Sequence, residues 1–185
     1  SGTDPLAGTI LDVQGASANS LFSINSNVNE AASNPGAETA GGSSTTFPAN
    51  TWYAVNTATV SRNTTTVASG QGSVQVNASG AFDGAENRLR TALSPNTRYN
   101  VSFSVRLQSG TLNDLGAYYT PDGSEANFVE CVGNSMPAFV GRWEKITCSF
   151  VTPASVITSQ NAFGIDQGAA GTRTFYIDNL SITQA

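Results

Sequence analysis

The sequence predicts an all-β fold, a sandwich of two antiparallel sheets. Ser, Thr, Asn, Gly and Ala dominate the 185 residues, and only 11% of the chain is charged. Runs of Thr, Val and aromatic residues are short and are interrupted by Gly, Pro, Asn and Asp, which is typical of short strands joined by turns. Long stretches rich in Glu, Lys and Leu, which would favour helices, are absent. These observations favour a β-sandwich.

The chain divides into two parts. Residues 1–33 contain two short apolar runs, 9–13 and 20–24, which we interpret as a short N-terminal β arm or linker. A flexible remnant of an upstream module is the alternative. Residues 34–185 form the sandwich, and the alternation of apolar and polar residues is clearest over 99–107. The expected strands, near nine in number, cover 52–60, 73–76, 87–93, 99–107, 115–120, 127–132, 143–151, 161–165 and 173–182.

Composition excludes several classes of function. The chain has no His, which excludes Ser-His-Asp and Cys-His catalysis and His-ligated zinc. A net charge of -5 with 8 Lys and Arg argues against nucleic-acid binding. No apolar run approaches the length that a membrane span needs, so no membrane insertion is expected. Asp83 and Glu86 could be paired carboxylates, but nothing marks either as catalytic, and we expect no enzyme activity.

The two cysteines are Cys131 and Cys148, and both fall on predicted strands. We expect a disulfide between them, worth roughly 3 kcal/mol in the chain-entropy model. An extracellular or cell-surface setting, a virion surface included, would favour this bond. Two buried free thiols in a reducing compartment are the alternative.

Four motifs, in order, resemble one family. They are 34–39 (NPGAET), 93–103 (LSPNTRYNVSF), 141–146 (GRWEKI) with CSF at 148–150, and 175–182 (FYIDNLSI). Over residues 34–185 their order and spacing resemble carbohydrate-binding modules of the family 4, 9, 16 and 22 type. The resemblance implies a jelly-roll β-sandwich, a structural calcium ion and often a sugar-binding groove on a concave sheet. Residues 1–33 resemble connecting segments of phage-tail proteins and long bacterial surface proteins.

The resemblance also implies where calcium would bind. The family's site uses the Glu of the opening motif and the Asp of the closing motif, which are Glu38 and Asp178 here. A backbone carbonyl near Gly36 and an oxygen near Ser73 would complete the oxygen ligands that calcium prefers. The ion would be structural, tying the first strand region to the last. In the alternative, Asp178 accepts backbone hydrogen bonds and Glu38 is solvated.

The candidate sugar-binding residues are of two kinds. Aromatic rings stack on the apolar face of a pyranose, and strand alternation places one of two adjacent tyrosines inside and the other outside. The cationic residues project opposite to core residues and, if their strands are neighbours, share one concave face that could hold an anionic or hydroxyl-rich glycan. A solvated face with Arg–Glu pairs is the alternative. The candidate residues are Trp52, Tyr118, Tyr119, Arg88, Arg90, Arg106 and Lys145, with Tyr53 and Phe128 as further aromatic residues.

Two functional hypotheses follow. The first is a non-catalytic carbohydrate-binding module of an extracellular or surface protein, whose partner is a polysaccharide or cell-surface glycan. The second is a structural or adhesive domain of a surface fibre or phage-tail-like protein, which binds no sugar and contacts neighbouring subunits through the arm. The sequence does not specify which glycan would bind.

Overall fold

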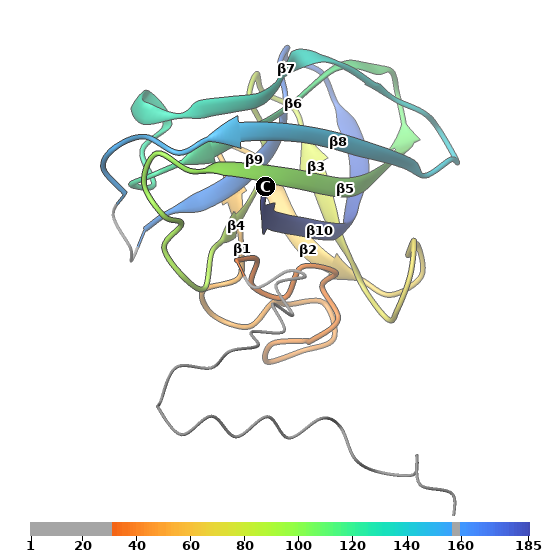
Figure 1. Cartoon of the computed structure of the whole chain (residues 1–185). Helices are drawn as coiled ribbons and strands as arrows, with labels where there is room; N and C mark the ends of the chain where they lie inside the picture. The colour runs from red at the N-terminus through yellow and green to blue at the C-terminus, as the bar shows by residue number, and fades with distance from the viewer. Residues whose placement is uncertain (1–30, 157–159) are drawn as a thin grey trace, which may run out of the picture.

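The computed structural model describes residues 31–156 and 160–185. They form two antiparallel five-stranded sheets that lie face to face in a jelly-roll β-sandwich (Figure 1). The predicted fold class is therefore confirmed. The predicted strands at 9–13 and 20–24 lie outside the described residues. Within that part of the chain the one helical element is a 3-10 turn, Glu125–Asn127, and no helix is long and apolar enough to span a bilayer.

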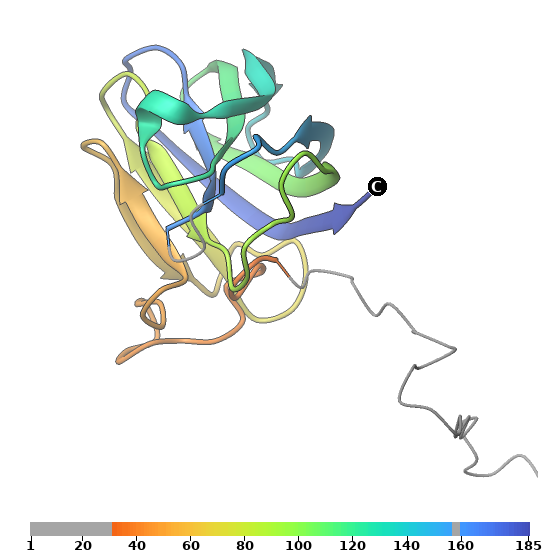
Figure 2. The same cartoon turned by 60° about the vertical axis from the view of Figure 1, so that its left-hand side comes forward.

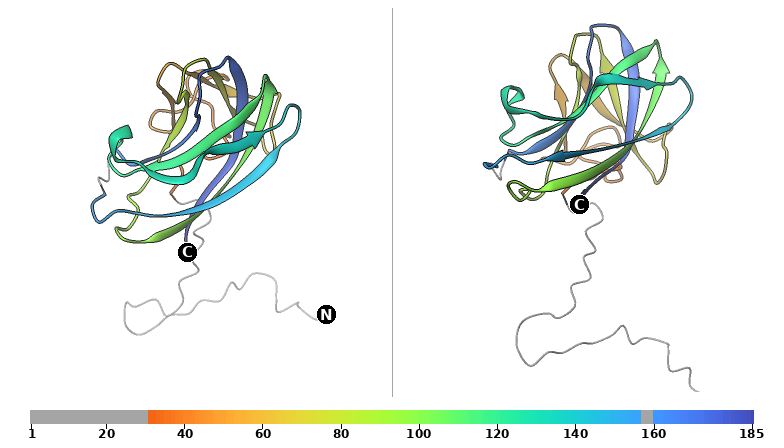
Figure 3. Two further views of the ribbon diagram at one scale, coloured as in Figure 1. Left: turned by 90° about the horizontal axis from the view of Figure 1, so that it is seen from above. Right: turned by 45° about the horizontal axis from the view of Figure 1, so that its top comes forward.

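The two layers are built from different strands (Figures 2 and 3). The layer that we call the front sheet has the order β1-β4-β9-β6-β7. Its strands are β1 Trp52–Val55, β4 Gly84–Arg88, β9 Ala162–Gln167, β6 Leu112–Thr120 and β7 Val129–Ala138. The back sheet has the order β2-β3-β10-β5-β8. Its strands are β2 Thr59–Asn63, β3 Ser73–Ala78, β10 Arg173–Gln184, β5 Arg98–Ser109 and β8 Glu144–Val151.

Two strand predictions need correction. The expected strand 52–60 is two strands in different sheets, because Asn56 has a φ of 53° and the Ala58 amide donates to the Val55 carbonyl, which closes a turn. The expected strand 87–93 ends at Arg88, and beyond it only an isolated bridge joins Leu89 to Ala32.

The core lies between the sheets and follows the predicted alternation. The apolar residues of β5 from Val101 to Leu107 face inward and are at most 2% exposed. They meet Phe163 and Ile165 of β9, which are fully buried. Each such side chain contributes about 1.5–3 kcal/mol of burial free energy, so this core holds the two layers together.

The predicted disulfide is confirmed. Cys131 on β7 is bonded to Cys148 on β8, with a Cα–Cα distance of 5.5 Å. These strands are the edge strands of the front and back sheets, so the bond closes one side of the sandwich. Ala31 and Ala32, which the sequence assigned to the arm, are buried against the sandwich, whereas the two-part division of the chain stays a prediction.

Candidate functional site

The outer face of the front sheet is hollowed by glycines on three neighbouring strands. Gly84 of β4 and Gly116 of β6 both pair with Asp166 of β9, while Gly164 of β9 pairs with Tyr118 of β6. A Cβ atom would overlap the β9 backbone at Gly84, the Asn134 amide at Gly116 and the Tyr118 ring at Gly164. Because none of these three positions carries a side chain, neighbouring side chains can pack directly against the backbone of the sheet there.

Tyr118 occupies the middle of this floor. Its ring lies over Gly164, and its hydroxyl donates to Glu86 Oε1 at 3.2 Å. The ring of Phe128 approaches Tyr118 edge-on, with 5.9 Å between the ring centroids. Tyr118 is 8% exposed, whereas Phe128 is 50% exposed. Phe128 is therefore the ring that offers an apolar surface to a ligand, and Tyr118 forms the base beneath it.

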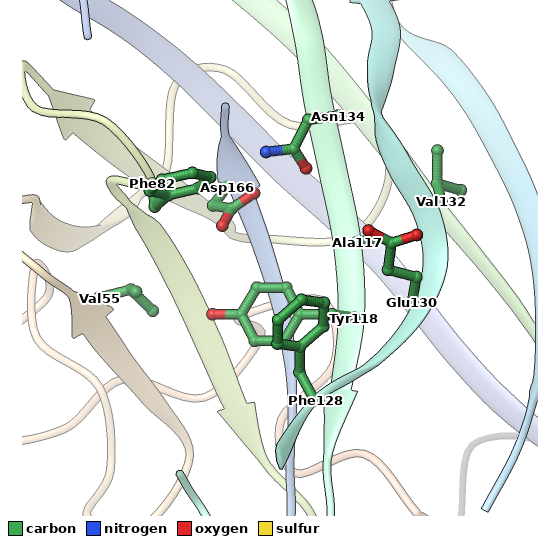
Figure 4. A pocket seen from close by; sticks show the side chains of 9 residues that line it. All are labelled: Val55, Phe82, Ala117, Tyr118, Phe128, Glu130, Val132, Asn134 and Asp166. Carbon is green, nitrogen blue, oxygen red and sulfur yellow. The ribbon is translucent and has the colours of Figure 1, made fainter. Parts of the chain in front are cut away.

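The result is a cleft of about 440 Å³ (Figure 4). Its side chains come from β1, β6, β7 and β9 and from the segments just before β4 and β7, so parts far apart in the sequence build it together. The lining residues are Val55, Phe82, Ala117, Tyr118, Phe128, Glu130, Val132, Asn134 and Asp166.

The polar groups of the cleft are acidic or neutral. Glu130 and Asp166 carry carboxylates and Asn134 carries an amide, whereas no Lys or Arg belongs to the lining. Carboxylates and amides are planar groups that accept hydrogen bonds from hydroxyls. Rings beside planar polar groups in a concave site form a surface that suits a sugar.

The structure does not bring the four predicted cations together. Arg88 ends β4 of the front sheet, where its guanidinium lies over the Tyr53 ring at 5.4 Å. Arg106 and Lys145 are on β5 and β8 of the back sheet. Arg90 is exposed beyond the end of β4. β5 and β8 are neighbours, but β4 belongs to the other layer, so the four cations do not share one face.

Two predicted aromatic residues lie in the interior. Trp52 is 5% exposed and its indole N–H donates to the Asn34 carbonyl at 2.9 Å, so it cannot offer a ring to solvent. Tyr119 is fully buried and stacks on Phe150 with 4.8 Å between centroids. Burial raises the pKa of Tyr119 well above its usual value, so the phenol stays protonated. Of the adjacent tyrosines, Tyr119 is the inward one and Tyr118 the outward one.

Several cleft residues could not be found from the sequence, because they come together only when the strands pair. The available signal was the glycines inside strand patterns, since such glycines mark a close approach of another group. The residues missed are Phe82, Glu130, Asn134 and Asp166.

The predicted metal ligands meet at the back sheet, where the turn before β3 lies beside β10. A Cβ atom at Gly36 would lie 2.9 Å from Glu38 Oε1 and 3.2 Å from Asp178 Oδ1, so both carboxylates flank the same glycine. Asp178 is fully buried. Desolvation raises the pKa of Asp178, although hydrogen bonds from the Ala68, Ser69 and Asn179 amides oppose this, and the charge of Glu38 raises it further. The Ser73 hydroxyl donates to the Thr66 carbonyl at 2.6 Å.

Beside these carboxylates lies Arg62 of β2, which is 7% exposed. Its guanidinium donates to the backbone carbonyls of four residues, Ala37, Glu38, Ser44 and Gln71. A buried charge is costly unless its donors are satisfied, and here carbonyl dipoles satisfy them. Arg62 therefore ties the loop after the opening motif to the turn before β3.

With this geometry established, comparison with known proteins identifies the family. The model of the family described as "Carbohydrate binding domain" (CBM 4/9) matches residues 41–163, which is more than half of the chain. The chain belongs to this family. Members of this family are non-catalytic binding domains, which supports the expectation that the domain is not an enzyme.

Solved structures agree on the fold of the carbohydrate-binding domain. The CBM22-1 xylan-binding domain of Xyn10C from Paenibacillus barcinonensis gives a TM-score of 0.59 at 14% identity, over 81% of this chain and 91% of that one. The CBM22-1–GH10 modules of endo-1,4-β-D-xylanase 10B from Clostridium thermocellum, complexed with xylohexaose, give 0.62 at 16% identity, over 84% of this chain and 29% of that one. At these identities the likeness concerns the fold alone. A search of curated proteins finds no match.

Proposed function

We propose that this domain binds a neutral polysaccharide in the cleft of the front sheet. The observation that carries the proposal is the half-exposed ring of Phe128 beside the carboxylates of Glu130 and Asp166, above a floor of glycines. The ring would stack on the apolar face of a pyranose, and the carboxylates would accept hydrogen bonds from its hydroxyls.

The charge of the cleft supports a neutral ligand over an anionic one. Two carboxylates and no Lys or Arg line it, so a uronic acid would meet like charges at short range. Arg88 lies over Tyr53 outside the lining. Of the anionic and the hydroxyl-rich glycan that the sequence left open, the cleft therefore favours the hydroxyl-rich one.

A polysaccharide panel tests the proposal. Xylan, mixed-linkage β-glucan, glucomannan and polygalacturonate are compared by affinity electrophoresis and titration calorimetry. We expect retardation by at least one neutral polysaccharide, none by polygalacturonate, and a tenfold or greater loss of affinity in Phe128→Ala. Phe139→Ala is the matched control, since Phe139 is 44% exposed and lies outside the cleft. Retardation by no polysaccharide would favour the fibre-domain hypothesis instead.

Xylan heads the panel because two of the structural relatives are described as binding xylan or holding xylohexaose. We further propose an extracellular or cell-surface setting, because a disulfide persists best in an oxidising compartment. Labelling of free thiols in protein isolated from its source would test this setting. Complete alkylation without prior reduction would contradict it.

We also propose a structural calcium ion held by Glu38 and Asp178. The residues fit such an ion, because the carboxylates of Glu38 and Asp178 converge on Gly36. Burial raises the pKa of Asp178, and a bound cation would lower it again. The described residues contain no group of three acidic, His or Cys side chains, so backbone oxygens would supply the other ligands. Bound calcium would link the loop before β1 to β10.

Thermal unfolding with and without chelator tests the ion. We expect calcium to raise the melting temperature, because a ligand at 100 times its Kd stabilises by about 2.7 kcal/mol. Glu38→Gln should abolish the calcium response. An unchanged melting temperature in both calcium and chelator would refute the site and leave the glycan proposal intact.

A further inference from the structure

Phe82 has an unusual backbone conformation. Its φ is 59°, in the left-handed region that disfavours residues with a Cβ atom. Of the seven non-glycine residues with positive φ in the described part of the chain, five are Asn, which tolerates this region, and another is Ala37. Phe82 is the one bulky residue among them. A bulky residue stays there only where the surrounding structure imposes the conformation.

Backbone and buried polar groups impose it, without help from the ring. The Phe82 amide donates to the Gln167 carbonyl at 2.8 Å, and Asn56 Nδ2 donates to the Phe82 carbonyl at 2.8 Å. The next residue, Asp83, is fully buried and its carboxylate accepts hydrogen bonds from the amides of Ser79, Gly80 and Thr57. A glycine at position 82 could make the same backbone bonds with less strain.

The Phe82 ring contributes little to the core. It is 52% exposed, the most exposed aromatic side chain of the described residues. Figure 4 shows it beside Asp166, at the end of the cleft away from Phe128. The strand pairing agrees, because Gly84, two residues on, pairs with both Val55 and Asp166. The chain thus presents an apolar ring at the Asp166 end of the cleft at a conformational cost.

We propose that Phe82 forms a second stacking subsite, which binds a sugar residue of the glycan beyond the one at Phe128. This inference rests on the proposed function and adds the extent of the site. Asp166 lies between the two rings and would accept hydrogen bonds from the hydroxyls of the sugar between them. The site therefore favours a chain of several sugars over a mono- or disaccharide.

The test uses Phe82→Gly with matched long and short ligands. Titration calorimetry compares the hexa- and disaccharides of xylan, cellulose and mannan for the wild-type domain, Phe82→Gly and the control Phe139→Ala. We expect Phe82→Gly to bind its hexasaccharide about tenfold more weakly, with disaccharide affinity unchanged. Its melting temperature should stay the same or rise, because backbone strain is relieved. A ring that served only the fold would give the opposite pattern, a lower melting temperature with unchanged affinity.

The outcomes separate this inference from the proposed function. If the wild-type domain binds a hexasaccharide, Phe128→Ala weakens it and Phe82→Gly does not, the subsite is refuted and the cleft stands. If the wild-type domain binds none of the oligosaccharides, both proposals fail. Phe82→Asn is a second variant, since Asn also tolerates positive φ, and it should reproduce the loss of hexasaccharide affinity.

Discussion

The outer faces of the two sheets differ although both sheets have five antiparallel strands. The front face carries aromatic rings and carboxylates above glycines, whereas the depression on the back face has hydroxyl and amide groups and no ring in its lining. The back residues are Asn100, Val101, Ser102, Thr147, Cys148, Ser149, Ser181 and Thr183. The positions of glycines and rings therefore distinguish the two faces, whereas the number of strands does not.

The buried polar contacts of Arg62 and Asp178 in the back sheet have a different role from the groups that line the cleft. Arg62 on β2 and Asp178 on β10 each bind backbone groups of loops that precede or follow the strands. These contacts concern how the chain enters and leaves the fold. We therefore expect changes there to alter stability, and changes on the front face to alter binding.

The largest effect is expected for Arg62→Met. The substitution leaves the carbonyls of four residues without their donor in a buried place, which we expect to cost about 3–5 kcal/mol. For a domain of this size that corresponds to a melting temperature lower by about 10 °C. Arg98→Met is the matched control, because Arg98 is exposed and its guanidinium donates to the Ser149 hydroxyl. Equal melting temperatures for the two variants would contradict the assigned role of Arg62, and glycan affinity below the transition should be unchanged.

Removal of the disulfide should have the next largest effect. The double variant Cys131→Ser with Cys148→Ser is expected to lose about 3 kcal/mol of stability, because the unfolded chain gains freedom. It should also bind glycan several-fold more weakly, since β7 carries Glu130, Val132 and Asn134 of the cleft. The pairing of β7 with β6 is interrupted by register shifts, so we expect the disulfide to help hold β7 in place. Denaturant unfolding and calorimetry measure the two effects. Unchanged affinity would show that β6 alone positions β7.

Gly164→Ala tests whether binding needs the glycine floor. Its Cβ would overlap the Tyr118 ring, so the ring must move and disturb Phe128 above it. We expect a tenfold loss of affinity, about 1.4 kcal/mol. Gly133→Ala is the control, because the nearest atom to its Cβ is Glu130 Oε2 at 3.7 Å. Both variants would be titrated with the same polysaccharide, and equal affinities would argue that the floor is not needed.

The smallest effect concerns pH and Asp83. Burial of this carboxylate raises its pKa, but hydrogen bonds from Ser79, Gly80 and Thr57 outweigh burial and hold the pKa below 3.8. A lowered folded-state pKa means that the stabilisation is present above pH 3.8 and is lost as the pH falls through the folded value. Asp83→Asn should therefore be less stable than wild type by about 1 kcal/mol at pH 7. The difference should shrink below pH 3.8 in urea unfolding, and a difference constant down to pH 2.5 would contradict it.

Local features of the chain predicted much of the fold. The alternation over 99–107 identified the inward residues of β5, and the cysteines on two predicted strands indicated the bond that forms. The site was predicted less well. Arg88 and Arg106 look equivalent in the sequence, since each projects opposite to core residues, yet they belong to different sheets. Trp52 looked like a sugar platform, but its indole has a buried backbone partner.

The all-β class, the main strands and the family motifs can be read from the chain, because strand periodicity and turn chemistry act over a few residues. Which strands are neighbours depends on groups distant along the chain, so it becomes visible only in the folded domain. Tyr118 lies over Gly164, and Phe82 meets Asp166, only after β6 and β4 have paired with β9. The cleft is therefore a property of strand order, which no single segment encodes.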